Sequence, residues 1–312
     1  MTLVSHDRSV RSLLKQGIEQ LRAAQVLSYT LAAELLLLHV TGRDRTWLYT
    51  HAEEVLSPET SEDYFALLRR RALGEPTQHL TGKQEFWGLE FEVTPDVLIP
   101  RPETEHLIEV ALDRLALREV RAGRPSRLNG EGITIVDIGT GSGCIAITLA
   151  KELTAATVYA TDISKAALDV ARRNAGRMGV VDRIQFLESN LLEAFVESQA
   201  TSHESRLFDL IICNPPYIGR READSLPIEV REHEPHAALY GGEEGYELYG
   251  ALIPQAAQRL KPSGLLILEL GYNSLPAVEP LLDRSDWVHV AVTKDLAGIP
   301  RVISAERLLA EP

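Results

Sequence analysis

The sequence predicts an α/β protein with a doubly wound parallel sheet, a small all-helical N-terminal domain and a β-hairpin linker between the two. Three observations predict this fold. Apolar residues fall at helical spacing up to about residue 81, and a short stretch after it alternates as hairpin strands do. From residue 133 onward, apolar strands alternate with helical stretches. That alternation favours parallel strands joined by right-handed crossovers.

Composition and net charge narrow the class of protein. The 312 residues are 45% hydrophobic and 25% charged, ordinary values for a globular chain long enough to hold two domains. A formal net charge of −13 argues against a surface built mainly to neutralise nucleic-acid phosphates. The N-terminus becomes polar too early for a secretory signal, and no apolar run approaches the ~18–20 residues that span a bilayer. We therefore expect a cytoplasmic protein without a membrane partner, in which Cys144 and Cys213 are reduced and buried.

The first 81 residues predict a helical domain. Helical periodicity is present at 9–24, 29–40 and 62–76. Ser57 and Pro58 together form a favourable helix start, because serine caps a helix and proline suits its first turn. The arginine run at 69–71 is either a docking patch or a solvated helix face. Since no catalytic constellation is evident in this region, we interpret residues 1–81 as a recognition domain.

Residues 82–102 predict a hairpin followed by a stiff linker. The stretch 86–93 (FWGLEFEV) alternates apolar and polar residues around Gly88, which is typical of two short strands joined by a turn. Pro100 and Pro102 then hold the backbone extended. This segment separates the helical domain from the rest of the chain.

The α/β domain is predicted over residues 103–312. Thr104 is placed to cap its first helix, and the polar stretch 123–132 to form a surface loop. Five apolar strands are predicted, at 133–138, 157–161, 183–188, 208–213 and 265–270. Helices are predicted at 144–153, 165–178 and 247–260. The tail contains two further strands, 287–295 and 301–308, expected to close one edge of the sheet as a hairpin.

The first strand of this domain runs into a glycine-rich turn, Gly139-Thr140-Gly141-Ser142-Gly143, and then into a helix. Glycines permit a tight turn and close approach of a ligand to the backbone, and a helix N-terminus offers free N–H groups. A dinucleotide fingerprint would need another glycine directly after Gly143, and a phosphate-binding loop would need a lysine. The turn therefore predicts a cofactor site that is not built around a phosphate.

Polar residues end the next two strands. Asp162 can accept both hydroxyls of a ribose, as the acid of Rossmann sites does, or it can cap the next helix, a role that Ser164 can also fill. Asn190 can contact an adenine edge or cap a helix, and Leu191 would then form an apolar wall beside the base. Ligands of such sheets lie beyond the carboxyl ends of the strands, so we expect these residues near the glycine turn.

The fourth strand ends at Asn214-Pro215-Pro216-Tyr217. Prolines stop strand pairing, and a residue before proline is held extended, so the Asn214 carboxamide should sit rigidly at the strand tip. It offers one acceptor and two donors, the Pro215 carbonyl adds an acceptor, and Tyr217 adds a flat aromatic face. The tetrapeptide predicts a site for a planar group that bears an –NH₂, the alternative being a plain strand-to-loop turn.

Two other kinds of site are not supported. The segment 233–236 (HEPH) lacks the histidine spacing of a helical zinc site and contains a proline, so no metal site is predicted. A serine-hydrolase elbow is also absent, because the residues 141–143 have the wrong spacing around their serine.

Together these strand-end motifs resemble those of class I S-adenosylmethionine-dependent methyltransferases, which have a Rossmann-like fold. The tetrapeptide resembles the motif of enzymes that methylate an exocyclic or amide –NH₂. Two flanking segments, 76–105 (PTQHLTGKQEFWGLEFEVTPDVLIPRPETE) and 234–249 (EPHAALYGGEEGYELY), resemble those of the HemK/PrmC family, the peptide chain release factor glutamine methyltransferases. The likeness covers essentially the whole chain, including the helical N-terminal domain.

The resemblance implies S-adenosyl-L-methionine as the cofactor. The implied cofactor-binding residues are Gly139, Thr140, Gly141, Ser142, Gly143, Asp162, Asn190, Leu191 and Asn214. Of these, the glycine turn would line the amino acid and ribose, Asp162 would bind the ribose hydroxyls, and residues 190–191 would flank the adenine. The implied catalytic and substrate-binding residues are Asn214, Pro215, Pro216 and Tyr217. Many relatives carry aspartate where this chain has Asn190, so we expect at most weaker cofactor binding.

The resemblance also implies the reaction, which is methyl transfer to the glutamine of the Gly-Gly-Gln motif of peptide chain release factors. One alternative is an adenine amino-methyltransferase of nucleic acid, whose target base would have to be flipped out or unpaired. The acidic charge balance counts against it. A second alternative is a non-catalytic cofactor-binding scaffold. We expect a monomer whose partners are release factors and not nucleic acid.

Overall fold

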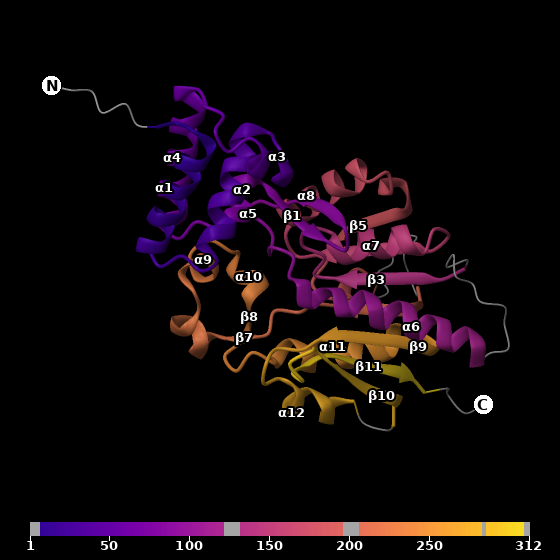
Figure 1. Ribbon diagram of the computed structural model, residues 1–312. Coiled ribbons are helices and arrows are strands. Elements are labelled where there is room, and N and C mark those ends of the chain that lie inside the picture. Colours follow the sequence, from indigo (N-terminus) through magenta and orange to yellow (C-terminus); the bar gives the residue numbers. More distant parts are fainter. Residues whose placement is uncertain (1–6, 122–131, 196–205, 283–284, 309–312) are drawn as a thin grey trace. The chain divides into compact units, whose positions relative to one another are not determined.

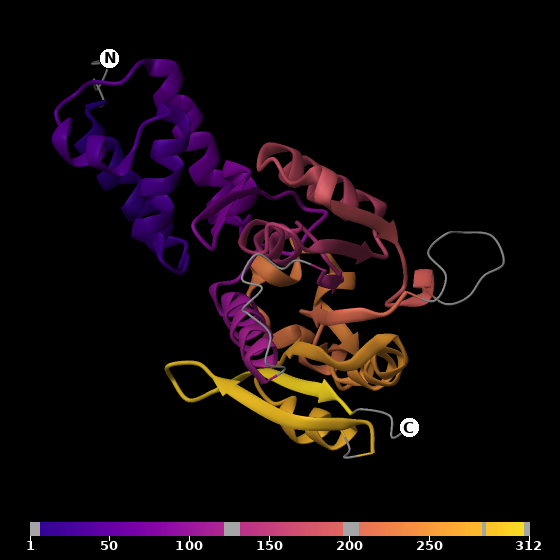
Figure 2. The same cartoon turned by 90° about the vertical axis from the view of Figure 1, so that its right-hand side faces the viewer.

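The computed structural model describes residues 7–121, 132–195, 206–282 and 285–308 (Figures 1 and 2). The chain divides into two compact units, Met1–Lys83 with Pro227–His233 and Gln84–Leu226 with Glu234–Pro312. We call them the helical unit and the sheet unit. Most of the loop predicted at 123–132 lies outside the described residues, so that prediction is not tested.

The described part of the helical unit is built from α-helices. They are α1 (Val10–Ala23), α2 (Tyr29–Thr41), α3 (Arg45–Thr50), α4 (Pro58–Ala72), α5 (Thr77–Thr81) and α9 (Ile228–Arg231). The predicted start at Ser57 is confirmed, because its hydroxyl accepts a hydrogen bond from the Thr60 amide. Leu13 of α1, Leu37 of α2 and Leu68 of α4 are among the buried side chains that hold the helices together. The predicted helical character of this region is confirmed.

The arginine run of α4 divides in the structure. Arg71 is buried and its guanidinium pairs with Glu229 of α9, whereas the exposed Arg70 pairs with Glu75. Neither a docking patch nor a solvated face therefore describes the whole run. Arg71 instead joins two segments of the helical unit that are far apart in the sequence.

A β-hairpin follows the helices, formed by β1 (Lys83–Phe86) and β2 (Leu89–Glu92). Its turn residues Trp87 and Gly88 both have positive φ, 54° and 70°, as tight hairpin turns require. Phe86 and Phe91 are buried and meet edge to face, with ring centroids 6.1 Å apart. The hairpin predicted around Gly88 is confirmed.

The sheet unit is organised around seven strands in the order β10-β11-β9-β6-β3-β4-β5. Five strands run parallel: β3 (Thr134–Ile138), β4 (Thr157–Asp162), β5 (Ile184–Glu188), β6 (Phe208–Cys213) and β9 (Leu260–Glu269). The last two, β10 (Trp287–Lys294) and β11 (Pro300–Arg307), form an antiparallel hairpin that pairs with β9 at one edge, as predicted. Strand order reverses between β3 and β6, which makes the carboxyl ends of these two strands the switch point.

Helices cover both faces of this sheet, and strand alternation explains why. Ile135 of β3 packs with α6 (Glu105–Arg121), α7 (Cys144–Glu152) and α8 (Lys165–Arg177), whereas its neighbour Val136 packs with α11 (Glu247–Arg259) on the other face. The remaining strands and helices are β7 (Ile218–Gly219), β8 (Tyr240–Gly242), α10 (His236–Leu239) and α12 (Leu275–Val278). The doubly wound α/β sheet is confirmed.

Two further expectations concern the cysteines and the membrane. Cys144 and Cys213 are free and buried, and burial raises the pKa of Cys144 to about 12. Both are core residues, as predicted. Among the helices that the structure describes, none is long and apolar enough to cross a membrane.

Candidate active site

The glycine turn lies at the switch point, between the end of β3 and the start of α7. Gly139, Gly141 and Gly143 all have positive φ, at 69°, 54° and 84°, so the backbone requires glycine there. A Cβ added to Gly139 or Gly141 would meet no atom within 4 Å, whereas one on Gly143 would lie 2.8 Å from Ile147. The first two glycines therefore border open space, and the third permits close packing of α7.

Asp162, at the end of β4, braces this turn. One carboxylate oxygen accepts a hydrogen bond from the Gly141 amide and the other from the Ser164 amide, both at 2.9 Å. Burial raises the pKa of the Asp162 carboxyl. The residue that caps α8 is Ser164, not Asp162, because the Ser164 hydroxyl accepts a hydrogen bond from the Ala167 amide. Each Asp162 oxygen keeps a lone pair with which it can accept a ligand hydroxyl.

Asp137 is a second buried carboxyl at this turn, and it was not among the predicted site residues. Its Oδ2 accepts hydrogen bonds from the Thr140 hydroxyl at 2.6 Å and the Ala146 amide at 3.2 Å. Its Oδ1 is buried without a hydrogen-bond partner in the described part of the chain. Burial raises the pKa of this carboxyl to about 7. The sequence did hold one signal, a lone acid within the apolar strand ITIVDI.

We expect Asp137 to make the unfolding free energy of the cofactor-free protein fall between about pH 4 and about pH 7. The folded carboxyl has a pKa of about 7, so the folded state holds the proton more tightly than the unfolded chain. The stability gained from that proton is present at low pH and is lost as the pH rises through the folded pKa. Urea unfolding across this range should give a smaller loss for Asp137→Asn than for the native protein. Equal losses would contradict the assignment.

Asn190 and Leu191 follow β5. Asn190 is exposed and its Nδ2 donates to Glu193 at 2.7 Å, while its backbone carbonyl accepts from the Glu193 amide. Leu191 is half-buried, with a φ of 51°. The side-chain contact of Asn190 is not a helix cap, in which the side-chain oxygen would accept from a backbone amide; the local hydroxyl that does so is that of Ser189, which accepts from the Ala194 amide. Contact of either residue with an adenine stays a prediction.

Asn214-Pro215-Pro216-Tyr217 follows β6, on the other side of the switch point from the glycine turn. The half-buried Asn214 donates from Nδ2 to the Thr104 hydroxyl at 3.1 Å. The Tyr217 hydroxyl donates to Oε1 of Glu269 at 3.2 Å. Burial and the nearby Glu269 carboxylate raise the pKa of Tyr217 well above its usual value. Side chains from two other segments thus hold both ends of the tetrapeptide.

Thr104 and Glu269 are the site residues that sequence reasoning missed here. Thr104 was predicted to cap a helix, but it ends a 3-10 turn, Pro102–Thr104, that runs directly into α6, and its hydroxyl accepts from Asn214 instead. Glu269 ends β9, beside β6, and is 2% exposed. A lone acid in the apolar run LLILEL was its only signal in the sequence.

The segment 234–249 packs against the backbone of the tetrapeptide. β8 pairs with β7, which directly follows Tyr217. A Cβ on Gly241 would lie 2.2 Å from the Pro216 carbonyl oxygen, and one on Gly245 would lie 2.4 Å from that of Tyr217. Two stretches of backbone therefore touch where only glycine fits, which fixes the path of the tetrapeptide.

The same segment is tied to the proline-rich linker. Glu234 is buried, and its carboxylate accepts from the Ile99 amide at 3.2 Å and from the Arg101 guanidinium. The two segments that carried the family resemblance, 76–105 and 234–249, therefore meet in the sheet unit. Their spacing in the sequence gave no sign of this contact.

Gly241→Ala should lower the turnover number by about 10²-fold, because a displaced Pro216 carbonyl shifts the whole tetrapeptide. Gly250→Ala is the matched control, since a Cβ on Gly250 of α11 meets no atom within 4 Å. Steady-state kinetics with melting curves of both variants would check this. Native turnover by a folded Gly241→Ala protein would show that the close contact does not matter to activity.

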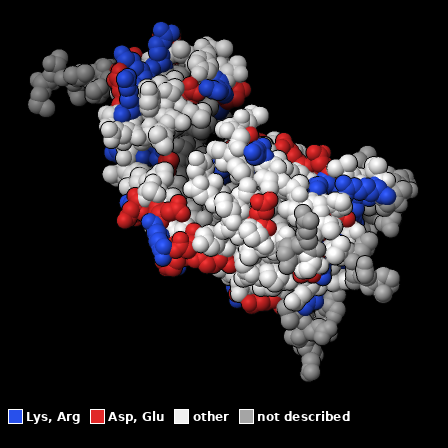
Figure 3. Space-filling model, turned by 90° about the horizontal axis from the view of Figure 1, so that it is seen from below, with Lys and Arg blue, Asp and Glu red and all other residues white. Residues whose placement is uncertain are grey.

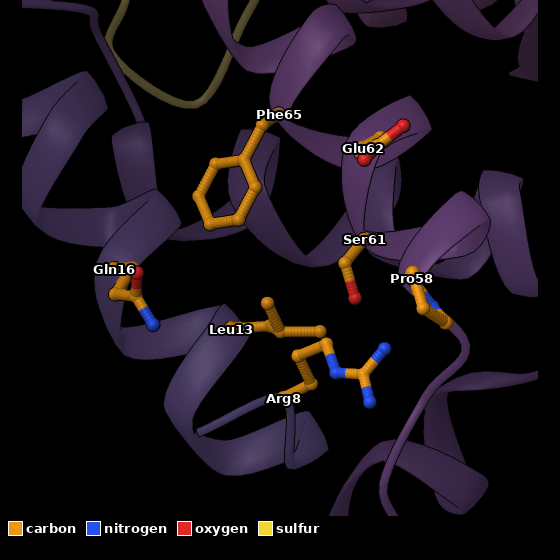
Figure 4. Close-up of a pocket in the computed structure, with 7 residues that line it drawn as sticks. All are labelled: Arg8, Leu13, Gln16, Pro58, Ser61, Glu62 and Phe65. Carbon is orange, nitrogen blue, oxygen red and sulfur yellow. The ribbon is translucent and has the colours of Figure 1, made fainter. Parts of the chain in front are cut away.

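A pocket of about 370 Å³ lies between α1 and α4 of the helical unit (Figure 4). It is lined by Arg8, Leu13, Gln16, Pro58, Ser61, Glu62 and Phe65, none of which is a predicted site residue. Within the described ranges, no three His, Cys, Asp or Glu side chains lie together as metal ligands would.

The sheet, with its glycine turn and strand-end residues, is that of a class I methyltransferase. Residues 126–229 match the family model of the methyltransferase small domain, and residues 12–82 match that of the PrmC N-terminal domain. The chain belongs to the release factor glutamine methyltransferase family. It is 42% identical over 295 residues to the release factor glutamine methyltransferase of Koribacter versatilis, covering 95% of this chain and 97% of the relative.

Other comparisons agree with this membership. The chain is 40% identical to the release factor glutamine methyltransferase of Bradyrhizobium diazoefficiens, over 96% of each chain. Among solved structures, the hMettl16 catalytic domain in complex with the MAT2A 3'UTR hairpin 6 has a TM-score of 0.53, at 18% identity over 77% of this chain and 81% of that one. At this identity, the structural likeness concerns the fold alone.

Proposed function

We propose that this protein transfers a methyl group from S-adenosyl-L-methionine to the side-chain amide nitrogen of the glutamine in the Gly-Gly-Gln motif of peptide chain release factors. The observation that carries the proposal is the Asn214 carboxamide. It is held at the end of β6, across the switch point from the glycine turn, in a chain of this family. We infer the release factor substrate from the family membership, and the way in which the amide nitrogen is methylated from the residues of the site.

The residues around the switch point fit the cofactor. Gly139 and Gly141 border open space, Asp162 has lone pairs for hydroxyls, and a buried oxygen of Asp137 has no partner among the described residues. We infer that residues 139–143 line the amino acid and ribose and that Asp162 binds the ribose hydroxyls. Asn190 and Leu191 flank the adenine in this proposal. When bound, the cofactor supplies an electrophilic methyl group.

The substrate side of the site must activate a poor nucleophile, because the lone pair of an amide nitrogen is delocalised into its carbonyl. The Asn214 Oδ1 and the Pro215 carbonyl accept the two hydrogens of the glutamine –NH₂ and orient its nitrogen. Tyr217 packs on the amide plane. Positioning supplies much of the acceleration, and the amide loses one proton after the methyl group has been transferred.

The remaining parts of the proposal concern partners. We infer that residues 1–81 recognise the release factor, which the match to the PrmC N-terminal domain supports. We also propose a monomer acting in the cytoplasm without a nucleic acid or membrane partner. The absence of a nucleic acid partner is supported by the net charge of −13, and on the face in Figure 3 the acidic and basic side chains of the described residues are interspersed without forming a broad basic surface.

Methyl transfer from labelled cofactor to a purified release factor tests this function. The control is a factor whose Gly-Gly-Gln glutamine is replaced by alanine. We expect label on the native factor alone. Label on the alanine factor would move the target elsewhere, and no label despite cofactor binding would overturn the proposal. The adenine alternative predicts instead a duplex affinity that falls steeply with salt.

A further inference from the structure

Asn174 is a fully buried carboxamide on α8 that the proposed chemistry does not use. Asparagine is a poor helix former, and a buried amide group needs hydrogen-bond partners. Its Nδ2 donates to the Ser142 carbonyl at 2.9 Å and to the Glu92 carbonyl at 3.0 Å. Its Oδ1 accepts from the Glu92 amide at 2.8 Å. One side chain therefore bonds both to the glycine turn and to strand β2 of the hairpin.

The three partners set the orientation of this carboxamide. Both hydrogens of Nδ2 face carbonyl oxygens and Oδ1 faces an N–H, so a reversed amide would lose all three hydrogen bonds. The Glu92 backbone uses its N–H and its C=O on Asn174, as it would with a further strand. An aspartate here would have the same shape but would lack both donors.

On the side of the glycine turn, Asn174 fixes the peptide unit between Ser142 and Gly143. The N–H of this unit donates to the Thr140 carbonyl at 2.8 Å, and its C=O accepts from Asn174. Because a peptide unit is planar, a hydrogen bond at each end sets the orientation of the whole unit. The turn also packs closely on α8, since a Cβ on Gly143 would lie 3.1 Å from that of Ala171. Helix α8 thus shapes the part of the turn that leads into α7.

On the side of the hairpin, α8 contacts β2 and the segment that follows it. Two valines of that segment and two residues of α8 form one buried cluster, made of Val93, Val97, Ala167 and Val170. At the surface, Arg173 pairs with the Glu92 side chain at 2.7 Å. The linker and the glycine turn therefore both pack on α8, and Asn174 hydrogen-bonds to both.

We propose that Asn174 is a positioning residue that couples the docking of the hairpin to the binding of the cofactor. The inference rests on the proposed function, in which residues 139–143 line the cofactor. A turn held by bound cofactor keeps the Ser142 carbonyl in place for Asn174, and Asn174 then holds the Glu92 backbone more firmly. Because the coupling of two linked sites is reciprocal, a docked hairpin raises the affinity for the cofactor by the same factor.

Hydrogen exchange of the Glu92 backbone amide, whose N–H bonds to Asn174, tests this coupling in the native protein. Saturation with S-adenosyl-L-homocysteine, the demethylated cofactor, should slow this exchange by about 10-fold, the size of a typical coupling between linked sites. Amides of β10, at the opposite edge of the sheet from β5, should exchange as before and provide the control. Unchanged exchange at Glu92 while the ligand is bound would overturn the coupling.

The variant Asn174→Ala removes all three hydrogen bonds. We expect calorimetry to show a Kd for S-adenosyl-L-homocysteine that is about 10-fold higher, and the ligand should no longer slow exchange at Glu92. At saturating S-adenosyl-L-methionine, kcat should stay near the native value, because the groups that contact the substrate are unchanged. Asn174→Asp keeps the acceptor for the Glu92 amide but lacks the donors, so its affinity should fall in the same way.

Arg173→Gln is the matched control. It removes the exposed ion pair between α8 and β2 but leaves the carboxamide contacts in place, so the Kd should stay native. Native affinity in a folded Asn174→Ala protein would overturn the positioning role. If neither variant at position 174 folds, the exchange experiment on the native protein still decides. A native protein that binds no cofactor would instead contradict the proposed function, so the two failures are distinguishable.

Discussion

Asn214→Ala should lower kcat for release factor methylation by about 10²- to 10³-fold, the loss found when one positioned group that contacts the reacting atoms is removed. The substitution deletes the acceptor that orients the amide nitrogen and leaves the Thr104 hydroxyl without its donor. The fold should survive, because the side chain is only half-buried at a strand end. Single-turnover transfer of labelled methyl groups, followed beside cofactor binding by calorimetry, measures the two effects separately.

Gln185→Ala is the matched control for this experiment. It removes an exposed carboxamide from the edge strand β5, away from the tetrapeptide, and should turn over as the native protein does. A folded Asn214→Ala protein with native kcat would show that the carboxamide does not act on the substrate. A loss of cofactor binding alone would assign Asn214 to the cofactor side of the site.

Asp209→Ala should cost about 3–5 kcal/mol of unfolding free energy, the usual consequence of removing one partner from a buried ionic cluster. Asp209 is 5% exposed and accepts from Arg118 at 2.7 Å, from Lys261 at 2.6 Å and from the Thr134 amide at 2.9 Å. The substitution would leave two cations and a strand amide without their acceptor. Urea unfolding at neutral pH provides the measurement.

The pH dependence of the destabilisation by Asp209→Ala tests whether it arises from the lost interactions of the Asp209 carboxylate. Burial alone would raise the pKa of Asp209, but the hydrogen bonds from Lys261, Arg118 and Thr134 outweigh it and lower the pKa. The stability it contributes is therefore present above the ordinary carboxyl pKa of about 4 and is lost as the pH falls through the lower folded value. The difference between native and variant should shrink in acid. The exposed pair of Asp169 and Arg172 gives the control, because Asp169→Ala should change stability little at any pH.

Local patterns in the sequence were sufficient to predict the seven strands of the main sheet, the long helices and the order of the motifs, but not β7, β8 or the short helices. Hydrophobic periodicity and helix capping are local properties of the sequence. The stretch FDLIIC and the Ser57 cap were therefore sufficient to place β6 and the start of α4. Because parallel strands bring their carboxyl ends to one edge, the glycine turn and Asp162 could also be expected together before any coordinates. The Gly141–Asp162 hydrogen bond bears this out.

The contacts that hold those motifs in place are visible only in the folded chain. Thr104 precedes Asn214 by 110 positions and Glu269 follows Tyr217 by 52, so no local pattern links them. In the sequence, a threonine before a helix indicates a cap, and a lone acid in an apolar run does not show which residue it pairs with. The neighbouring strands decide what each of these side chains contacts. The polar partners of this buried site come from segments that are distant in the sequence, and folding alone brings those groups together.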